Sequence, residues 1–299
     1  MTAGLSDLDL RYLEHSALAL AGGGELYYED RGEGPPLVFL NNFYIVSPVW
    51  RNFTGRLAEG HRLITYDLRN QGASQPGTAA VSFADHVEDL RVLLDHLGLP
   101  KVYLVGTSIS TLIARDFALA HPERVAGSVL IGPAFSPNGG FRRELISRSW
   151  LATLTAGGTQ GLFDHIYPLV FPDQVVHAGG PAAYLALRDN FMALLSRSSI
   201  KENLTASLDV DDDPELLSRL PGRTLIIIGD GDFAWSQSVL DDACARIPNC
   251  QGVVLPRAGH VPYFEAPDGF QDAVAAFVAD CEAGGGPPGG SAPTGPEAG

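Results

Sequence analysis

A serine stands where a strand pattern gives way directly to a helix pattern. The apolar run 102–105 is typical of a strand buried on both faces of a parallel sheet, and Gly106 ends it. Residues 112–120 then place apolar side chains at helical spacing. Ser108 therefore lies on a tight turn, where the Ile109 amide at the helix N-terminus can stabilise an oxyanion. This position suits the nucleophile of an acyl transfer, and the alternative role for Ser108 is to cap the helix.

A nucleophilic serine needs a base and a carboxylate that orients the base, because a serine hydroxyl is scarcely ionised at neutral pH. Two later segments supply these groups, each directly after a predicted strand. Asp230 and Asp232 follow the strand 225–228, and His260 follows a strand that ends at Leu255. All strands of a parallel sheet end at the same edge, so these groups are expected to converge there with the serine.

Alternating strands and helices surround these residues and predict an α/β fold, a mostly parallel central sheet with helices on both faces. A hairpin over 16–30 opens the pattern, and Ser82 with Asp85 resembles a capping box. We expect residues 1–132 and 222–281 to form this core. The strands are expected at 37–40, 63–66, 102–105, 128–131, 224–228 and 252–255, and the helices at 50–57, 82–97, 112–120, 238–247 and 267–280.

The segment 133–221 interrupts the alternation with helices and no strands. The helices are expected over 141–155, 161–171, 181–195 and beyond Ser199. A helical block inserted between two strands, at the edge where ligands bind, is expected to form a lid. Trp150 and Tyr167 within it are candidates for the substrate pocket, and packing inside the lid is the alternative role for both.

Polar and aromatic residues after the strand 37–40 are further pocket candidates: Asn41, Asn42 and Tyr44. Asparagine tolerates left-handed backbone angles better than other residues that carry a side chain. Asn42, and Asn70 after the strand 63–66, are therefore predicted to hold turns that would otherwise require glycine.

Composition and charge restrict the classes of partner. The 299 residues suffice for one large domain with an insertion or for two small ones, and the net charge of −15 argues against nucleic acid and anionic membranes as partners. No apolar run approaches the roughly 20 residues of a bilayer span, and no leader pattern opens the chain, so we expect a cytoplasmic protein. Its three cysteines lack zinc-site spacing. The Gly- and Pro-rich tail 282–299 is expected to be disordered.

Five segments in order make the chain similar to the α/β-hydrolase superfamily from about residue 17 to 281. They are YDLRNQGAS, VGTSIS, AHPERVAGSVLIGP, LIIIGDGD and RAGHVPYFEAPDGF. The resemblance implies that Ser108 is the nucleophile and that His260 is the general base and then the acid. It selects Asp232 over Asp230 as the orienting carboxylate, because the family's acid lies three residues beyond the glycine held here by Gly229.

The resemblance also implies that the amide of Phe43 forms the oxyanion hole together with that of Ile109, and that no metal or organic cofactor takes part. The chain departs from the family at three places. Asn41-Asn42 stands where His-Gly is usual, and glycine is lost at Asn70 and Ser110. A serine-asparagine pair at the first place is familiar in β-ketoadipate enol-lactone hydrolases, which several other segments also resemble. These departures indicate a divergent branch.

The predicted function is that of a serine hydrolase acting on a small, partly hydrophobic ester, lactone or thioester. An acyltransferase or a cyclising, lactone-forming enzyme of a biosynthetic pathway is the first alternative, because the same acyl-enzyme can pass to another nucleophile. A lyase or isomerase that uses His260 as base, with Asn41 or Asn42 polarising the substrate, is the second. A ligand-binding protein is the third. The sequence does not indicate the oligomeric state.

Overall fold

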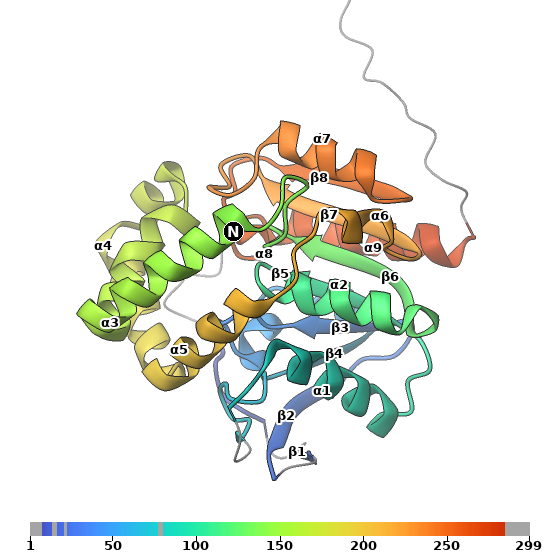
Figure 1. The fold of residues 1–299 in the computed structure, drawn as a ribbon, viewed down its shortest axis with the longest axis horizontal. Coiled ribbons are helices and arrows are strands. Elements are labelled where there is room, and N and C mark those ends of the chain that lie inside the picture. Colours follow the sequence, from blue (N-terminus) through green and yellow to red (C-terminus); the bar gives the residue numbers. More distant parts are fainter. Residues whose placement is uncertain (1–7, 14–16, 21–22, 77–79, 285–299) are drawn as a thin grey trace, which may run out of the picture.

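The computed structural model describes residues 8–13, 17–20, 23–76 and 80–284 (Figure 1). The described residues form one sheet of eight strands, in the order β1-β2-β4-β3-β5-β6-β7-β8. They are β1 (Ala17–Ala19), β2 (Glu25–Arg31), β3 (Pro36–Leu40), β4 (Arg62–Tyr66), β5 (Val102–Thr107), β6 (Val125–Ile131), β7 (Arg223–Gly229) and β8 (Cys250–Leu255). Only the pairs β1-β2 and β2-β4 are antiparallel, which confirms the predicted mostly parallel sheet.

Helices cover both faces of the sheet (Figure 1). One face carries α1 (Phe83–His96), α2 (Ser110–Ala120), α6 (Glu215–Ser218) and α7 (Gln237–Arg246), and the other carries α9 (Pro267–Glu282). The central strands β3 and β5 are buried along almost their whole length, as their continuous apolar runs require. Helix α1 begins with the predicted capping box of Ser82 and Asp85. The short helix α8 (Pro262–Glu265) was not predicted.

The helix predicted over 50–57 does not form. Two 3₁₀ turns, η1 (Ser47–Asn52) and η2 (Leu57–Glu59), take its place. The Thr54 hydroxyl donates a 2.7 Å hydrogen bond to the carbonyl of Trp50, the group that an α-helix would pair with the Thr54 amide. The Phe53 amide donates to the same carbonyl at 3.0 Å, which is the i to i+3 bond of a 3₁₀ turn, and Trp50, Phe53 and Leu57 remain in the core.

Between β6 and β7 the chain forms helices and no strand, over residues that the structure describes throughout. We call α3 (Phe141–Val170), α4 (Asp173–Leu194), α5 (Arg197–Ala206) and the 3₁₀ turn η4 (Ser207–Asp209) the helical insertion. Gly158 and Gly180 adopt non-helical angles, with φ of 66° and 59°, and each breaks the helix that contains it. The helix expected at 181–195 is thus preceded by a further helical segment that begins at residue 173. The division into core and lid stays a prediction.

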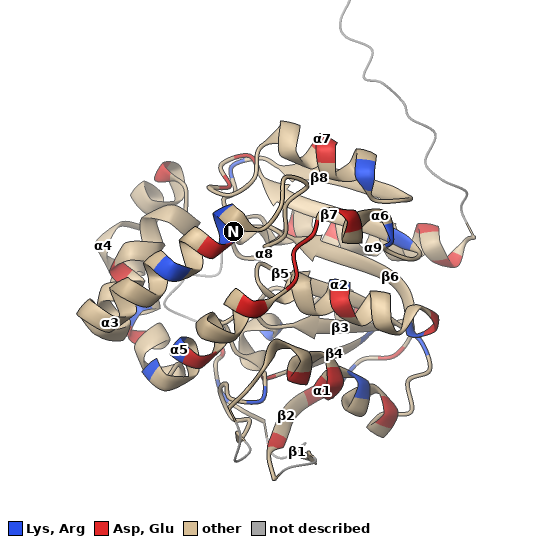
Figure 2. Ribbon diagram, viewed as in Figure 1, with Lys and Arg blue, Asp and Glu red and all other residues tan. Residues whose placement is uncertain are grey.

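Ion pairs join the insertion to the core. In Figure 2 the connection from α5 to α6 is drawn in red, because residues 211–213 are all aspartate. Asp212 accepts from Arg115 of α2 at 3.0 Å and from Arg143 of α3 at 3.2 Å, and all three side chains are buried to 10% exposure or less. The described helices include none that is both long and apolar enough to cross a bilayer. Most of the predicted disordered tail, from residue 285 onward, lies outside the described residues.

Candidate active site

Ser108 occupies the turn between β5 and α2. Its φ of 51° is in the left-handed region, which is unfavourable for a residue with a side chain. Two bonds hold the turn in this conformation: the Ser108 amide donates to the carbonyl of Ile131 at 2.8 Å, and the Thr111 hydroxyl donates to the Ser108 carbonyl at 2.6 Å. The sharp turn presents the Ser108 hydroxyl to a cavity at the end of the sheet.

The structure brings Ser108, His260 and Asp232 into one hydrogen-bonded row. Oγ of Ser108 lies 3.0 Å from Nε2 of His260, and Nδ1 of His260 lies 3.0 and 3.1 Å from the two carboxylate oxygens of Asp232. His260 and Asp232 are buried, whereas Asp230 is exposed and accepts from the Ala258 amide. This arrangement can move a proton from the serine to the histidine while the carboxylate orients the ring.

Residues that the sequence analysis did not single out fix the position of the histidine. Gly132, with a φ of 48°, lies so close that a Cβ atom there would be 2.9 Å from Nδ1 of His260. Glu265 accepts from the Gly259 amide at 2.7 Å, and the His260 amide donates to the carbonyl of Val170 at the end of α3. Burial raises the pKa of Glu265 to about 7. The loop that carries His260 is therefore hydrogen-bonded both to α8 and to the helical insertion.

The predicted oxyanion residues lie beside the serine. Phe43 and Ile109 both line the cavity that Ser108 faces. Within the described part of the chain, neither backbone amide donates to a backbone carbonyl or a side chain. The turn that carries Phe43 is held by Asn42, whose Oδ1 accepts from the Tyr44 amide at 2.8 Å. Two free amides beside a nucleophile are the donors that an oxyanion requires.

The asparagines play other roles than those predicted. Neither Asn42 nor Asn70 has a positive φ, and only Asn42 holds its own turn, through the bond from the Tyr44 amide to its side chain. The side-chain amide of Asn70 forms hydrogen bonds with Glu202 and Asn203 of α5. These bonds connect the loop that follows β4 to the helical insertion. Asn41 is fully buried, and its side chain forms hydrogen bonds with Asp67, Gln71 and Trp50. It therefore lines neither of the two cavities beside Ser108.

Two cavities share Ser108 and His260 in their walls. The wide cavity, of about 350 Å³, is also lined by Phe43, Ile109, Phe233 and Trp235. The narrow cavity, of about 140 Å³, is lined by Leu8 and Leu10 and by Phe163, Leu187, Phe191 and Leu194 of the helical insertion. Of the predicted pocket residues, Asn42, Tyr44 and Trp150 line both cavities and Tyr167 lines the narrow one.

The fold and the site match those of known enzymes. Residues 37–273 match the model of the alpha/beta hydrolase family. The chain belongs to this family. The resemblance drawn from the sequence motifs is thereby confirmed, and the protein is a hydrolase.

Several relatives of this hydrolase have known names. A pimeloyl-[acyl-carrier protein] methyl ester esterase of Aliivibrio salmonicida is 30% identical over 82% of this chain and 92% of its own. A putative non-heme chloroperoxidase of Synechocystis is 28% identical over 79% of this chain and 88% of its own. The enol-lactonase of Burkholderia xenovorans superposes with a TM-score of 0.78 at 22% identity, covering 88% of this hydrolase and 100% of the lactonase. Similarity of this last kind demonstrates the shared fold.

Among the described parts of the chain, no group of three or more histidine, cysteine, aspartate or glutamate side chains is arranged to hold an ion. The three cysteines are free, and two of them, Cys244 and Cys250, lie together between α7 and β8, on neither cavity wall.

Proposed function

We propose that this protein hydrolyses a carboxylic ester, lactone or thioester of a small, partly hydrophobic molecule through an acyl-enzyme on Ser108. The observation that carries the proposal is the row of Ser108, His260 and Asp232, with spacings near 3.0 Å, in a cavity that is also lined by Phe43 and Ile109, whose amides have no acceptor among the described residues. The names of two relatives, a methyl ester esterase and an enol-lactonase, agree with this class of substrate.

The geometry supports a two-step reaction. Ser108 Oγ attacks the substrate carbonyl carbon and its proton passes to Nε2 of His260, while the Phe43 and Ile109 amides donate to the developing oxyanion. The imidazolium, stabilised by Asp232, then protonates the leaving alkoxide or thiolate as its bond to carbon breaks. A water molecule gives its proton to His260 and attacks the acyl-enzyme, which releases the acid and restores the Ser108 hydroxyl.

The cavity walls support a substrate with a substantial apolar part. Apart from the serine and histidine, the narrow cavity is lined mostly by aliphatic and aromatic side chains, and aromatic residues line much of the wide one. Burial of hydrocarbon against such walls contributes about 25 cal/mol per Å². The helical insertion supplies many of these residues, and we propose that it serves as the lid of the site.

Treatment with a fluorophosphonate, followed by intact-mass measurement and peptide mapping, tests the proposal. Attack by Ser108 forms a serine–phosphorus bond and expels fluoride, so we expect one adduct on Ser108 that is absent from Ser108→Ala. Hydrolysis of a simple aryl ester should fall about 10⁴-fold or more in Ser108→Ala and His260→Ala. A folded wild-type protein that forms no adduct, or a Ser108→Ala variant that keeps full turnover, would contradict the proposal.

A further inference from the structure

An extended segment near the N-terminus forms part of the narrow cavity. We call residues 8–13 the strap. Leu8 and Leu10, which alternate with polar residues, line the cavity. The residues that follow them, Asp9 and Arg11, keep 40% and 86% of their side chains exposed. The alternation of apolar and charged residues over this stretch is visible in the sequence and is the signal that could have revealed the strap.

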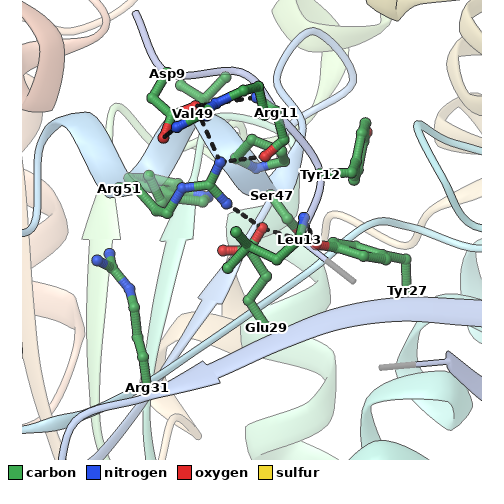
Figure 3. A network of polar contacts seen from close by, with 12 residues as sticks. Asp9, Arg11, Tyr12, Leu13, Tyr27, Glu29, Arg31, Ser47, Val49 and Arg51 are labelled. Carbon is green, nitrogen blue, oxygen red and sulfur yellow. Dashed lines mark hydrogen bonds and ion pairs between the residues drawn. The ribbon is translucent and has the colours of Figure 1, made fainter. Parts of the chain in front are cut away.

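Arg51 clamps the strap to the sheet (Figure 3). Its side chain, only 12% exposed, pairs with Glu29 of β2 at 2.5 Å and donates to the carbonyl of Arg11. Asp9 and Asn52 add a reciprocal pair of bonds: the Asp9 amide donates to Asn52 Oδ1 at 2.8 Å, and Asn52 Nδ2 donates to the Asp9 carbonyl at 3.1 Å. The backbone on both sides of Leu10 is therefore fixed, which fixes the leucine relative to the cavity.

A second anchor joins the strap to the loop network beside the oxyanion turn. The Tyr12 hydroxyl donates to Asp67 at 2.8 Å, and the Leu13 amide donates to the hydroxyl of Tyr27 at 3.0 Å. Asp67 also accepts from Asn41, next to the turn that carries Phe43. The strap is thus built into the framework of the site, and Leu8 and Leu10 form a fixed boundary of the cavity.

The other residues that line the narrow cavity indicate which kind of ligand group the cavity accepts. The insertion faces the narrow cavity with Phe163, Leu187, Phe191 and Leu194, and the total volume is about 140 Å³. A space of this size between apolar walls accepts a short hydrocarbon chain and leaves the polar groups of a substrate unpaired. Ser108 and His260 lie in the same wall, so a bound chain would extend from the reacting carbonyl.

We propose that the narrow cavity is the subsite for the hydrocarbon part of the substrate and that Leu8 and Leu10 of the strap set the length of chain that it accepts. This inference rests on the proposed serine chemistry. A larger side chain at either position would shorten the subsite. A smaller one, or a released clamp, would lengthen it.

Phosphonate inactivators of graded length test this inference. O-ethyl O-(4-nitrophenyl) alkylphosphonates with methyl, butyl and octyl chains form a Ser108–phosphorus bond and release 4-nitrophenolate, which gives a second-order rate constant for each length. In Leu8→Trp and Leu10→Trp we expect the octyl-to-methyl ratio of rate constants to fall by about fourfold for each methylene that loses its contacts. Leu10→Ala should raise the ratio. Leu13→Trp, on the exposed part of the same strap, is the matched control and should leave it unchanged.

A variant that weakens the attachment of the strap provides an independent readout. Asn52→Ala removes the two bonds to Asp9 while the Arg51–Glu29 pair remains, so the fold should persist while the octyl-to-methyl ratio rises. Thermal unfolding of each variant identifies any that fails to fold, and Asn52→Ala is the second choice if a tryptophan variant does. Ratios that stay at the wild-type value in folded, labelled strap variants would overturn the inference and leave the proposed function intact. A wild-type protein that no phosphonate labels would overturn both.

Discussion

At the scale of single residues, the site depends on backbone conformations that few side chains allow. Ser108 adopts a φ of 51° with the help of two hydrogen bonds, and Gly132 adopts a φ of 48° directly against the imidazole of His260. Strain of this kind persists only where the surroundings determine the conformation, and it is frequent at sites of catalysis.

Gly132→Ala should reduce activity far more than stability. The new Cβ would lie 2.9 Å from Nδ1 of His260 and would displace the ring from Ser108 and Asp232. A displacement of about 1 Å lowers kcat/KM roughly 10²-fold. Gly222→Ala is the matched control, because Gly222 also has a positive φ, 72°, but its Cβ would meet only the Ala126 carbonyl at 4.0 Å. Steady-state kinetics on an ester should separate the variants, and equal kcat/KM values would refute the prediction.

Glu265 should give the stability a characteristic pH dependence. Burial raises its pKa from 4.5 to about 7. Across this window the folded protein keeps a proton that the unfolded chain has released, so its contribution to the free energy of unfolding falls as the pH rises, by up to about 3 kcal/mol. Glu265→Gln removes this titration. Urea unfolding of both proteins at about pH 5 and about pH 7.5 measures the effect, and a difference between them that is independent of pH would show that the group does not titrate in this range.

At the scale of elements, Ser110 joins the two strand ends that carry the site. Its hydroxyl accepts from the Thr107 amide at 2.9 Å, at the end of β5. It lies 2.8 Å from the carbonyl of Leu40, the last residue of β3, which leads to the turn of Phe43. The position at which the family usually has glycine thus supplies a hydrogen bond between the serine turn and the oxyanion turn. The sequence did not predict this bond.

Ser110→Ala should lower both stability and turnover. The buried Thr107 amide loses its side-chain acceptor, which costs about 1–3 kcal/mol. The end of β3 loses one restraint, so the Phe43 amide should be less well aligned and kcat should fall several-fold. Denaturant unfolding and steady-state kinetics measure the two effects. Ser218→Ala, an exposed serine of α6, should stay within about 0.5 kcal/mol of the wild type. A Ser110→Ala protein with unchanged stability would contradict this account.

At the scale of the whole molecule, the helical insertion is held to the sheet domain by buried charge. Asp212 lies between Arg115 of the core and Arg143 of the insertion, and its side chain is 6% exposed. Asn70 and Asn203 add a second contact between the two parts, and the Val170 carbonyl, which binds the His260 amide, adds a third. These contacts couple the walls of the cavities to the residues that would perform the chemistry.

Asp212→Asn should destabilise the protein by about 3–5 kcal/mol, because it leaves two buried guanidinium groups without their shared carboxylate. Arg115 keeps its pair with Asp116, which limits the loss at that residue. Asp189→Asn, which breaks a surface pair with a 71% exposed carboxylate, should cost less than about 1 kcal/mol. Denaturant unfolding compares the two, and similar losses in both variants would mean that the buried cluster does not hold the insertion in place.

The elements that the sequence predicted correctly have strong local signals. Helix α1 has an apolar stripe and a capping box, and the central strands have uninterrupted apolar runs. Local signals failed at two turns after β3. The Phe53 amide bonds the carbonyl of Trp50 in a 3₁₀ turn where a helix was expected, and Asn42 holds its turn through its side chain instead of a left-handed backbone.

The sequence by itself determined the alternation of strands and helices, the place of the insertion, and the three residues expected at the ends of their strands, because periodicity and turn signals are local properties of the chain. Only the tertiary structure decided what surrounds those residues. The contacts of His260 with Gly132 and of Ser110 with Leu40 span more than 60 residues each, and the bonds of Arg51 and Asn52 that hold the strap beside the cavity span 40 residues or more. Such contacts arise from packing, which no local pattern encodes.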